Sequence, residues 1–563
     1  MTGPVLVMGV ILLTAGLHRT DCMVYHVTFL GKDHIENGEP TVGELRYQGT
    51  GNTPTVINEV GCEWKQEGTT NIKKLVPKGN CLGLVPKSVG ISPAGFKVES
   101  HGEFILHVYQ SDTTGTLADG FLAIPDEHLG TEYYVVTYCS LGGFCQFAVV
   151  GTVDKTSVNI VFPRQVSPDI ITCNGETLPV NAPPGEPIPF FLNENEVLHI
   201  ESTENKTDLS GTYIASDHEV AVFVGARDVP TASGSAAYMI EQIPPVNKWG
   251  TDFVVAPNYL NDAGDIIKIV TKSEETTVHI LGFSPFTISS KGESIERRID
   301  WEVHSSIHAS EPILIVQVMS LNIYNDTTIV TGSPAMVLVP HIKQWTDKEE
   351  YYSDCLQKAE NQSILTTVAE TGNTGSITLL LTQGGDLLPN WTTINGSDYS
   401  VQKIGPMSPE SEARHSQGAN RSTYGYCDGK SAVLLHAKWD WENEECIPTA
   451  PAPGDRIDND CDGKIDEDNC TQNDRRIEFT STQDAETGEA TFKSINVRGA
   501  SPVHFRVTSC DIVVVSLRTS SEPVMSYTAR ITPSLVLLQA CTPECETKTI
   551  SVSGEIFQKN KTK

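Results

Sequence analysis

Basic residues are scarce in this chain. Of its 563 residues, 40 are Lys or Arg and 71 are Asp or Glu, which gives a formal net charge of −31 at pH 7. Nucleic-acid binding needs clustered Lys and Arg to contact phosphates, so this balance argues against a nucleic-acid partner. Cysteine is also sparse. The 14 Cys are too few for a disulfide-dense miniature scaffold, but they allow a few disulfides per domain in an oxidising compartment.

Long apolar runs are missing after the N-terminus, which predicts a mature protein without a transmembrane anchor. The N-terminal stretch MTGPVLVMGVILLTAG has a short apolar core at residues 5–13, followed by small residues. This pattern is typical of a secretory signal peptide, and a buried N-terminal strand is the alternative. We therefore expect residues 1–22 to be a signal peptide and the mature protein to be secreted and extracellular.

Two further features predict an extracellular protein. Cys139 and Cys145 flank a Gly-Gly turn, so we expect a disulfide across a β-hairpin, and Cys62 and Cys81 form a second candidate pair. No Cys-x-x-Cys pair supports the alternative of cytosolic metal ligation. Asn-x-Ser/Thr acceptor sites for N-glycosylation are frequent and occur at Asn205, Asn325, Asn361, Asn390, Asn395, Asn420, Asn469 and Asn560.

Helical periodicity is almost absent. Short segments rich in β-branched and aromatic residues recur instead, and Gly, Pro, Asn, Asp and Ser separate them. Examples are QFAVVGTV, EVAVFVGA, DIIKIVT and PILIVQVM. This pattern predicts an all-β fold.

The strand-rich part contains an internal repeat. The segments at 146–160 and 266–280 align at an offset of 120 residues without a gap, as do GTEYYV and GTDFVV before them. A second element recurs at 98–109, 214–226 and 307–319, and a Pro-led segment follows each copy. We expect tandem repeated β-sandwich-like modules, with β-propeller blades as the alternative, and the same strands at the two aligned segments.

Four segments resemble the N-terminal domain of the IgGFc-binding protein family: IPDEHLGTEYYV, TYIASDHEVAVFVGAR, EQIPPVNKWGTDFVVAP and GDIIKIVTKSEETTVHI. The resemblance runs from Val24 to about Tyr352, with a fainter continuation to Trp441, and Leu209–Ile280 is its most specific part. It implies an extracellular binding module of mucus or cell surfaces, whose partner is a glycoprotein, a mucin or an immune ligand. It does not establish immunoglobulin binding, because no Fc-contact motif can be carried over and the family's cysteine-rich von Willebrand D-type modules are absent.

Composition divides the chain into further parts. Within the repeated region, residues 353–446 are less regular and include a polar loop. A Pro/Ala-rich stretch reads as a stiff linker and marks the clearest boundary. The predicted parts are the signal peptide at 1–22, repeated β modules at 23–446, the linker at 447–454, an Asp-rich calcium-binding loop at 455–470, a small β domain at 477–545 and a tail at 546–563. The small domain faintly resembles the accessory module named after farnesoic acid O-methyltransferase.

The segment DRIDNDCDGKIDEDNC has the spacing of a metal site. Carboxylates at alternate positions followed by Gly463 match the opening of an EF-hand calcium loop, in which the carboxylates converge on one cation. The twelfth position is Asn469 instead of the usual bidentate Glu, so we expect an affinity suited to extracellular calcium. A solvated acidic linker is the alternative. The expected calcium ligands are Asp458, Asp460, Asp462, the carbonyl of Lys464, Asp466 and Glu467.

The same segment resembles the short motifs grouped under the MopE-type metal-binding name. Copper suits it less than calcium, because all its side-chain ligands are hard oxygens. Cys461 and Cys470 bracket the loop. They can close it by a disulfide, or Cys461 can pair outside it, for example with Cys446.

Enzyme signatures are missing from the sequence. We find no G-x-S-x-G elbow, H-E-x-x-H zinc helix, P-loop or dinucleotide fingerprint. We therefore predict a secreted, non-enzymatic binding or adhesion protein. The alternative is an acidic, calcium-binding structural component of an extracellular matrix. Outside residues 455–468 the acidic residues are dispersed, which favours the binding protein.

Overall fold

The computed structural model describes most of the chain up to residue 441 and six strands beyond it. The described residues are 22–31, 41–49, 53–67, 72–78, 81, 84–86, 90–112, 118–140, 142–163, 172–173, 176–177, 185–202, 204–231, 236–257, 264–319, 322–324, 328–331, 334–348, 350–353, 362–381, 385–387, 390–407, 412–415, 418–428, 433–436, 438–441, 478–483, 489–495, 504–508, 526–530, 535–541 and 547–553.

The chain forms two compact units, Met1–Asn443 and Glu444–Lys563. The second unit has two three-stranded antiparallel sheets, ordered β37-β38-β40 and β39-β41-β42. Its last strand lies within the stretch that the sequence assigned to a tail, so strand structure continues beyond residue 545. The strands of this unit are β37 (Glu478–Gln483), β38 (Glu489–Ile495), β39 (His504–Thr508), β40 (Ser526–Arg530), β41 (Leu535–Cys541) and β42 (Thr547–Ser553).

The first unit consists of four related modules. The first contains β1 (Cys22–Val27), β2 (Thr41–Gly49), β3 (Thr55–Asn58), β4 (Trp64–Glu67), β5 (Lys73–Pro77), β7 (Phe96–His101), β8 (Phe104–Asp112) and β9 (Ala118–Leu122). β6 (Gly90–Ser92) precedes β7 in the chain but pairs with β16 in the sheet of the second module. The second contains the 3₁₀ turn η2 (Asp126–His128), β10 (Gly130–Tyr134), β11 (Phe144–Gly151), β12 (Thr156–Val161), β13 (Thr172–Cys173), β14 (Glu176–Thr177), β15 (Ile188–Leu192), β16 (Val197–Glu201), β17 (Tyr213–Pro230) and β18 (Ala236–Ile243).

The third and fourth modules follow in the same order. The third contains η4 (Val246–Lys248), β19 (Gly250–Val255), β20 (Asp265–Thr271), β21 (Thr276–Ile280), β22 (Phe286–Ile288), β23 (Ser294–Ile299), β24 (Ser305–Met319), β25 (Asn322–Tyr324), β26 (Thr328–Thr331) and β27 (Ala335–Leu338). The fourth contains η5 (Ile342–Gln344), β28 (Glu350–Ser353), β29 (Gln362–Glu370), η6 (Thr371–Ser376), β30 (Leu379–Leu381), β31 (Gly385–Leu387), β32 (Thr392–Thr393), β33 (Tyr399–Met407), β34 (Glu412–His415), β35 (Arg421–Asp428) and β36 (Val433–His436).

Each module is a small β-sandwich. One long strand, or two shorter strands in its place, contributes to both sheets of the sandwich. In the second module, the first half of β17 pairs with β10 and β12, and its second half pairs with β11 and β18. We call the sheet that contains β10, β12 and β15 the outer sheet, and the sheet that contains β18, β11 and β16 the inner sheet. The third module repeats this plan with β24 as its long strand, and its side chains form a core of their own between the two sheets.

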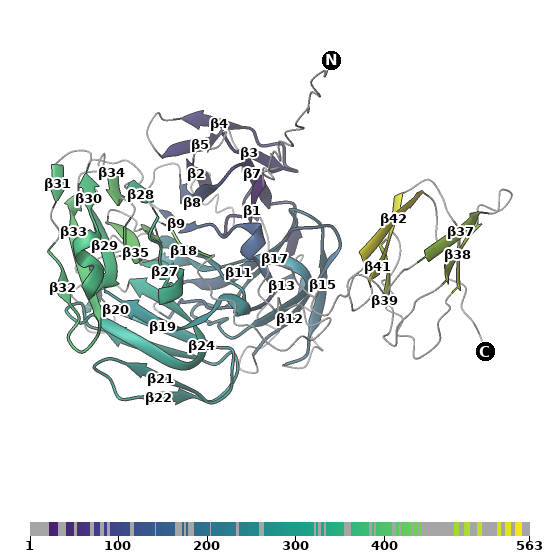
Figure 1. Ribbon diagram of the computed structural model, residues 1–563. Coiled ribbons are helices and arrows are strands. Elements are labelled where there is room, and N and C mark those ends of the chain that lie inside the picture. Colours follow the sequence, from purple (N-terminus) through teal and green to yellow (C-terminus); the bar gives the residue numbers. More distant parts are fainter. Residues whose placement is uncertain are drawn as a thin grey trace, which may run out of the picture. The chain divides into compact units, whose positions relative to one another are not determined.

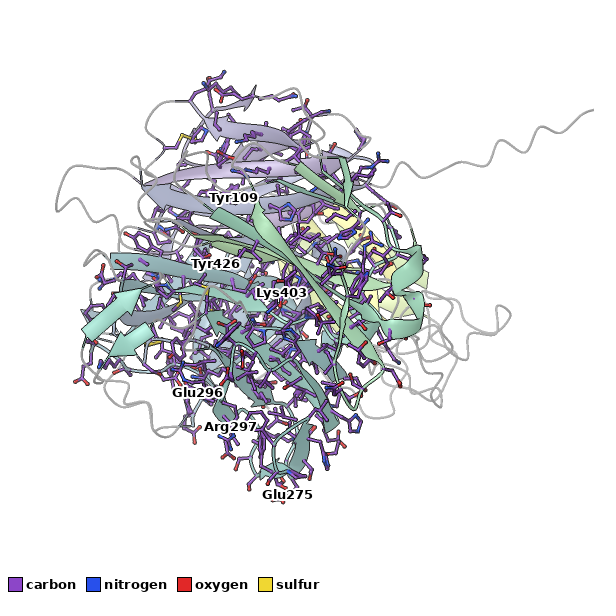
Figure 2. The ribbon with its side chains drawn as sticks, turned by 90° about the vertical axis from the view of Figure 1, so that its left-hand side faces the viewer. Tyr109, Glu275, Glu296, Arg297, Lys403 and Tyr426 are labelled. Carbon is purple, nitrogen blue, oxygen red and sulfur yellow. A yellow bond between two sulfur atoms is a disulfide. The ribbon has the colours of Figure 1, made fainter. Side chains whose placement is uncertain are left out.

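The repeat predicted from the sequence is confirmed at the level of strand register. Residues 146–160 and 266–280 hold the same two strands, β11 with β12 and β20 with β21. Gly130 pairs with Val220 and Gly250 pairs with Ile313, and the register shifts just after each of these glycines. The turns before β12 and β21 also match, because Lys155 and Glu275 both adopt a positive φ. Figure 2 shows Glu275 at the extremity of the third module.

A fourth module occupies the part that the sequence analysis described as less regular. The first and fourth modules divide the long strand in two, as β7 with β8 and as β34 with β35, so their outer and inner sheets are separate. The register of the last strand is nevertheless shared by all four modules. The equivalent pairs are His107–Leu122, Phe223–Gln242, Val316–Leu338 and Tyr424–His436.

The four modules close into a ring. Their last strands, β9, β18, β27 and β36, gather in the middle: β9 packs against β18 and β36, and β27 packs against the same two strands. We call these four the axial strands. Figure 1 shows the first module at the top, the second on the right, the third at the bottom and the fourth on the left, around β9, β18 and β27. Each module is therefore a β-sandwich, as predicted from the sequence. The four modules are arranged around an axis, which is the arrangement that the alternative, a β-propeller, would have.

Buried side chains satisfy the backbone edges of the axial strands. An axial strand ends its own inner sheet, so its free edge exposes N–H and C=O groups that need partners once water is excluded. Gln242 Oε1 accepts the N–H of Ile124 at 2.9 Å, and Asp119 Oδ2 accepts the N–H of Ile240 at 2.9 Å. These two bonds join the first module to the second.

The remaining junctions follow the same rule. Glu241 Oε2 accepts the N–H of Leu338 at 3.2 Å, which joins the second module to the third. His436 Nε2 donates to the carbonyl of Leu338 at 2.6 Å, and His107 Nε2 donates to the carbonyl of His436 at 2.8 Å. The ring is thus closed by side-chain-to-backbone hydrogen bonds at every junction.

Further contacts join different modules. His26 Nδ1 lies 2.7 Å from Asp126 at the first junction, and Lys268 Nζ lies 2.6 Å from Asp208 at the second. At the end of the fourth module, the Trp441 ring stacks on His128 of the second module with centroids 5.7 Å apart. Asp126 and His128 both belong to η2. This one turn therefore contacts both β1, the first strand of the ring, and Trp441, its last described residue.

A buried tyrosine binds at the register shift in the second module, and an equivalent tyrosine binds the long-strand position in the first. Tyr133 Oη donates to the carbonyl of Val220 at 2.6 Å and accepts the N–H of Gly130 at 3.0 Å. Tyr25 Oη donates to the carbonyl of Phe104 at 2.5 Å in the first module. The third module has Phe253 at this position, and its ring is buried in the same way.

Replacing Tyr133 with Phe should lower the free energy of unfolding by about 1–3 kcal/mol, because the buried carbonyl of Val220 and the partly buried N–H of Gly130 lose their partner. Urea unfolding of the two proteins measures the difference. Tyr213→Phe is the matched control, since its hydroxyl contacts only the exposed Glu132, and it should change stability by less than about 0.5 kcal/mol. Equal unfolding midpoints for Tyr133→Phe and the unmodified protein would show that the hydroxyl does not support the register shift.

Candidate functional site

The ring axis gathers titratable side chains, but their hydrogen bonds are structural. Burial, and after it the neighbouring Asp119 carboxylate, raises the pKa of Glu241 well above its usual range. Burial, and to a smaller extent His107, lowers the pKa of His436 to about 4. Each of these side chains binds a backbone group of a neighbouring module. Among the described residues, no three His, Cys, Asp or Glu side chains lie close enough to hold a metal ion.

The predicted calcium ligands lie outside the described residues. Asp458, Asp460, Asp462, Lys464, Asp466 and Glu467 all fall in the stretch between Trp441 and β37, as do Cys461 and Cys470. The calcium site and the disulfide that would close it therefore remain predictions.

Two disulfides join the pairs expected from the spacing, Cys62–Cys81 and Cys139–Cys145, with Cα atoms 5.4 and 5.6 Å apart. The expected hairpin across the second pair is wrong. Strands β10 and β11, which precede and follow this turn, both pair with β17 and not with each other. Gly142 and Gly143 adopt positive φ angles of 144° and 90°, so the turn does need glycine, but it links the outer sheet to the inner sheet.

Four of the eight predicted glycosylation sites belong to the described residues. Asn205, Asn390, Asn395 and Asn420 are all exposed. The first lies before β17 of the second module, and the other three lie in the fourth module. The remaining sites, Asn325, Asn361, Asn469 and Asn560, lie outside the described residues.

The outer sheet of the second module presents an aromatic surface. Tyr134 and Tyr213 lie directly opposite each other on β10 and β17, with ring centroids 5.0 Å apart. Phe191 on β15 lies opposite Ser157 on β12, and 66% of the Phe191 side chain is exposed, more than of any other large hydrophobic residue among those described. These side chains point away from the module's core, because the alternate residues Tyr133, Val158 and Ile214 are buried.

Polar residues complete this surface. Glu132, Ala215, Asn159 and Pro189 form one row across β10, β17, β12 and β15. Tyr213 Oη donates to Glu132 Oε1 at 2.5 Å, and the pKa of Tyr213 is raised, first by burial and then by this carboxylate, so the phenol stays protonated. We define the aromatic face as Glu132, Tyr134, Ser157, Asn159, Pro189, Phe191, Tyr213 and Ala215.

The same positions of the third module carry no aromatic residue. Thr287, Ser306 and Val254 stand where the second module has Phe191, Tyr213 and Tyr134. His279 and His308 lie opposite each other on this face, and His308 Nδ1 lies 2.7 Å from Asp252 Oδ1. The two modules share their fold and register, so the fold itself does not require aromatic residues at these positions.

Sequence reasoning missed the aromatic face. The segment IPFFL shows that one of its two Phe residues must point outward, since neighbours in a strand face opposite sides. It cannot show that Phe191, and not Phe190, is the exposed one, or that two tyrosines from β10 and β17 join it. The 120-residue alignment does contain a usable signal: it places Tyr134 against Val254 and so marks this face as a point where the modules differ.

The first unit is thus a multi-module β protein: a closed ring of four β-sandwich modules, with buried polar side chains at its axis and outward sheet faces of differing chemistry. The family described as "IgGFc binding protein" matches residues 119–425, which is more than half of the chain. The chain therefore belongs to the IgGFc-binding protein family. The matched residues run from the first axial strand to β35, whereas the ring begins at β1 and needs β36 to close.

Individual proteins give weaker similarities. The "IgGFc-binding protein" of Homo sapiens is 24% identical over 310 residues, which cover 54% of this chain and 5% of that protein. Among solved structures, a "Biofilm associated protein - BSP domain" has a TM-score of 0.13 at 8% identity, over 90% of this chain and 82% of that one. A tetra-tandem repeat in the extending region of a large adhesion protein has a TM-score of 0.10 at 10% identity, over 80% and 95%. These TM-scores are too low to support a structural argument.

No helix within the described residues is long and apolar enough to cross a membrane.

Acid should weaken the ring through His436. Its pKa is about 4 in the folded protein and about 6.5 in an unfolded chain, so the unfolded state binds more protons between these values. The contribution of neutral His436 to the free energy of unfolding is complete above pH 6.5 and is lost as the pH falls toward 4. Urea unfolding at pH 7.5 and at pH 5 should show a loss of stability that His436→Gln reduces. His308→Gln, at an exposed site, is the control and should leave the loss unchanged.

Proposed function

We propose that this protein is a secreted, extracellular binding protein whose ring presents its sheet faces to an immunoglobulin Fc ligand. The observation that carries the proposal is the family match, because it covers the second and third modules entirely and most of the fourth. The family and the human relative are both named for binding to IgG Fc, and neither is named for a reaction. The chain spans 5% of the length of the human protein, so the partners of that protein transfer to this chain only as a proposal.

Three features of the chain support an extracellular location. Two disulfides hold the first and second modules, and such bonds persist in oxidising compartments. The four described glycosylation sites are exposed, as acceptors must be. The N-terminal stretch has the composition of a signal peptide. Adhesion to a mucin or to another glycoprotein would suit the same location, and a binding assay separates these ligands.

The calcium loop belongs to this proposal as a separate part. Its D-x-D-x-D-G spacing lies between the ring and the last β domain in the sequence. Calcium would satisfy carboxylates that repel one another without a cation, and would order the segment that follows the linker. Extracellular calcium is abundant enough to fill a weak site of this kind.

The protein should bind an immobilised Fc fragment of IgG and should not bind the Fab fragment of the same antibody. Biolayer interferometry with the full chain measures both. A mucin-coated sensor gives the third comparison. Binding to mucin with no response to Fc would replace the Fc proposal with mucus adhesion.

Calcium should bind the full chain with a dissociation constant on the order of 10⁻⁴ to 10⁻³ M. Isothermal titration measures it, and the double variant Asp460→Asn, Asp462→Asn should lose most of the heat, because two ligand charges disappear at nearly constant shape. The control is Asp300→Asn, a single acidic site outside the loop. Equal heats from the double variant and the unmodified protein would reduce the segment to an acidic linker.

A further inference from the structure

The aromatic face of the second module is an exposed surface that the fold does not use. Phe191 is 66% exposed, whereas the other exposed large hydrophobic residues among those described reach 37–42%. Contiguous apolar side chains on a soluble surface mark an interaction site, whereas scattered ones do not. The strand order is β15-β12-β17-β10, so Asn159 and Val161 of β12 lie between the β15 residues Phe191 and Pro189 and the paired tyrosines. All of these side chains lie on one outward face of the sheet.

The third module provides an internal comparison. Its outer sheet has the same strands and the same register, yet Thr287 and Ser306 replace Phe191 and Tyr213. If the module needed aromatic residues there for stability, both copies would be expected to have them. Tyr134 does have a structural role, because it also packs against Trp249 with ring centroids 6.2 Å apart. The stability of the fold therefore gives no reason for aromatic side chains at Phe191 and Tyr213.

The charge of this face restricts its partner. The outer-sheet strands β10, β12 and β15 and the first half of β17 contain no Lys or Arg, and they carry the carboxylates Glu132, Asp217 and Glu219. Glu132 and Glu219 are exposed, and Asp217 is partly exposed. Surfaces that associate have complementary potentials, so the partner brings positive charge to this face.

The chemistry of the face favours a folded protein as the partner. Tyrosines dominate the binding energy of protein interfaces, because they bury a large, rigid ring and keep a polar tip in contact with the partner. An outward sheet face with aromatic side chains on its flanking strands, and with carboxylates but no Lys or Arg, matches this arrangement. We infer that the aromatic face is the docking site for the protein ligand of the proposed function, and that the ligand surface combines apolar contacts with Lys and Arg. This inference rests on the proposed function.

The test uses the full chain and an immobilised IgG Fc fragment as the probe. Phe191→Ala should weaken binding at least tenfold, because the most exposed aromatic side chain of the face is lost. Phe283→Ala is the matched control: its side chain is 39% exposed in the third module, and its removal should leave binding unchanged. Both variants should keep the urea midpoint of the unmodified protein, since both side chains are largely exposed.

A second variant tests the charge. Glu132→Gln should slow association and flatten its dependence on salt, because rim charges act mainly on the association rate. Asp300→Asn in the third module should change neither.

The outcomes separate the inference from the function on which it rests. Fc binding that persists unchanged in Phe191→Ala overturns the docking site and leaves the proposed function in place. No Fc binding by the unmodified protein overturns the proposed function, and the inference then falls with it. Fc binding that Phe191→Ala weakens and Phe283→Ala does not supports both.

Discussion

The free backbone edge of the axial strands is the constraint on which the ring depends. A strand at the end of a sheet leaves N–H and C=O groups without partners, and these groups cannot be buried unpaired. Here four such edges meet where water is excluded. Asp119, Glu241, Gln242, His107 and His436 supply the missing donors and acceptors, and each reaches into a neighbouring module. The hydrogen bonds therefore hold four sandwiches in one arrangement, which apolar packing alone would specify less well.

The axial strands fix the arrangement of the modules, and the outward faces of the outer sheets take no part in it. The modules can therefore differ in the residues on these outward faces. The long strand and the axial strand keep one register in all four copies, because a slip by one residue would turn the core side chains outward. No such demand acts on the outward face of an outer sheet. The second module uses that freedom for Phe191 and Tyr213, and the third for His279 and His308. The axis preserves the architecture, and the outer faces are free to take on different partners.

The sequence could predict the elements whose signal is local. The all-β class, the strands at 146–160 and 266–280 and their repetition all follow from alternation and spacing. The fourth module was missed, because β35 reads RSTYGYCD and shares almost no apolar pattern with the equivalent part of β17. The expected hairpin at Cys139–Cys145 failed for a related reason: a turn shows that the chain reverses, but the partner strand β17 lies far along the chain. The axial side chains have no local signal at all, since their partners belong to other modules.

The position of the two ends of the ring has a mechanical consequence. His26 of β1 and Trp441 both contact η2, through Asp126 and His128 respectively, so the chain enters and leaves the ring at the same place. Tension applied through the flanking segments would act on the place where both ends of the ring contact η2, and would bypass most of the ring. No disulfide lies at this junction among the described residues, so its contacts can separate without the breaking of a covalent bond. Within a longer chain the ring would hang to one side of the line of force, and it could open at this junction while every module stayed folded.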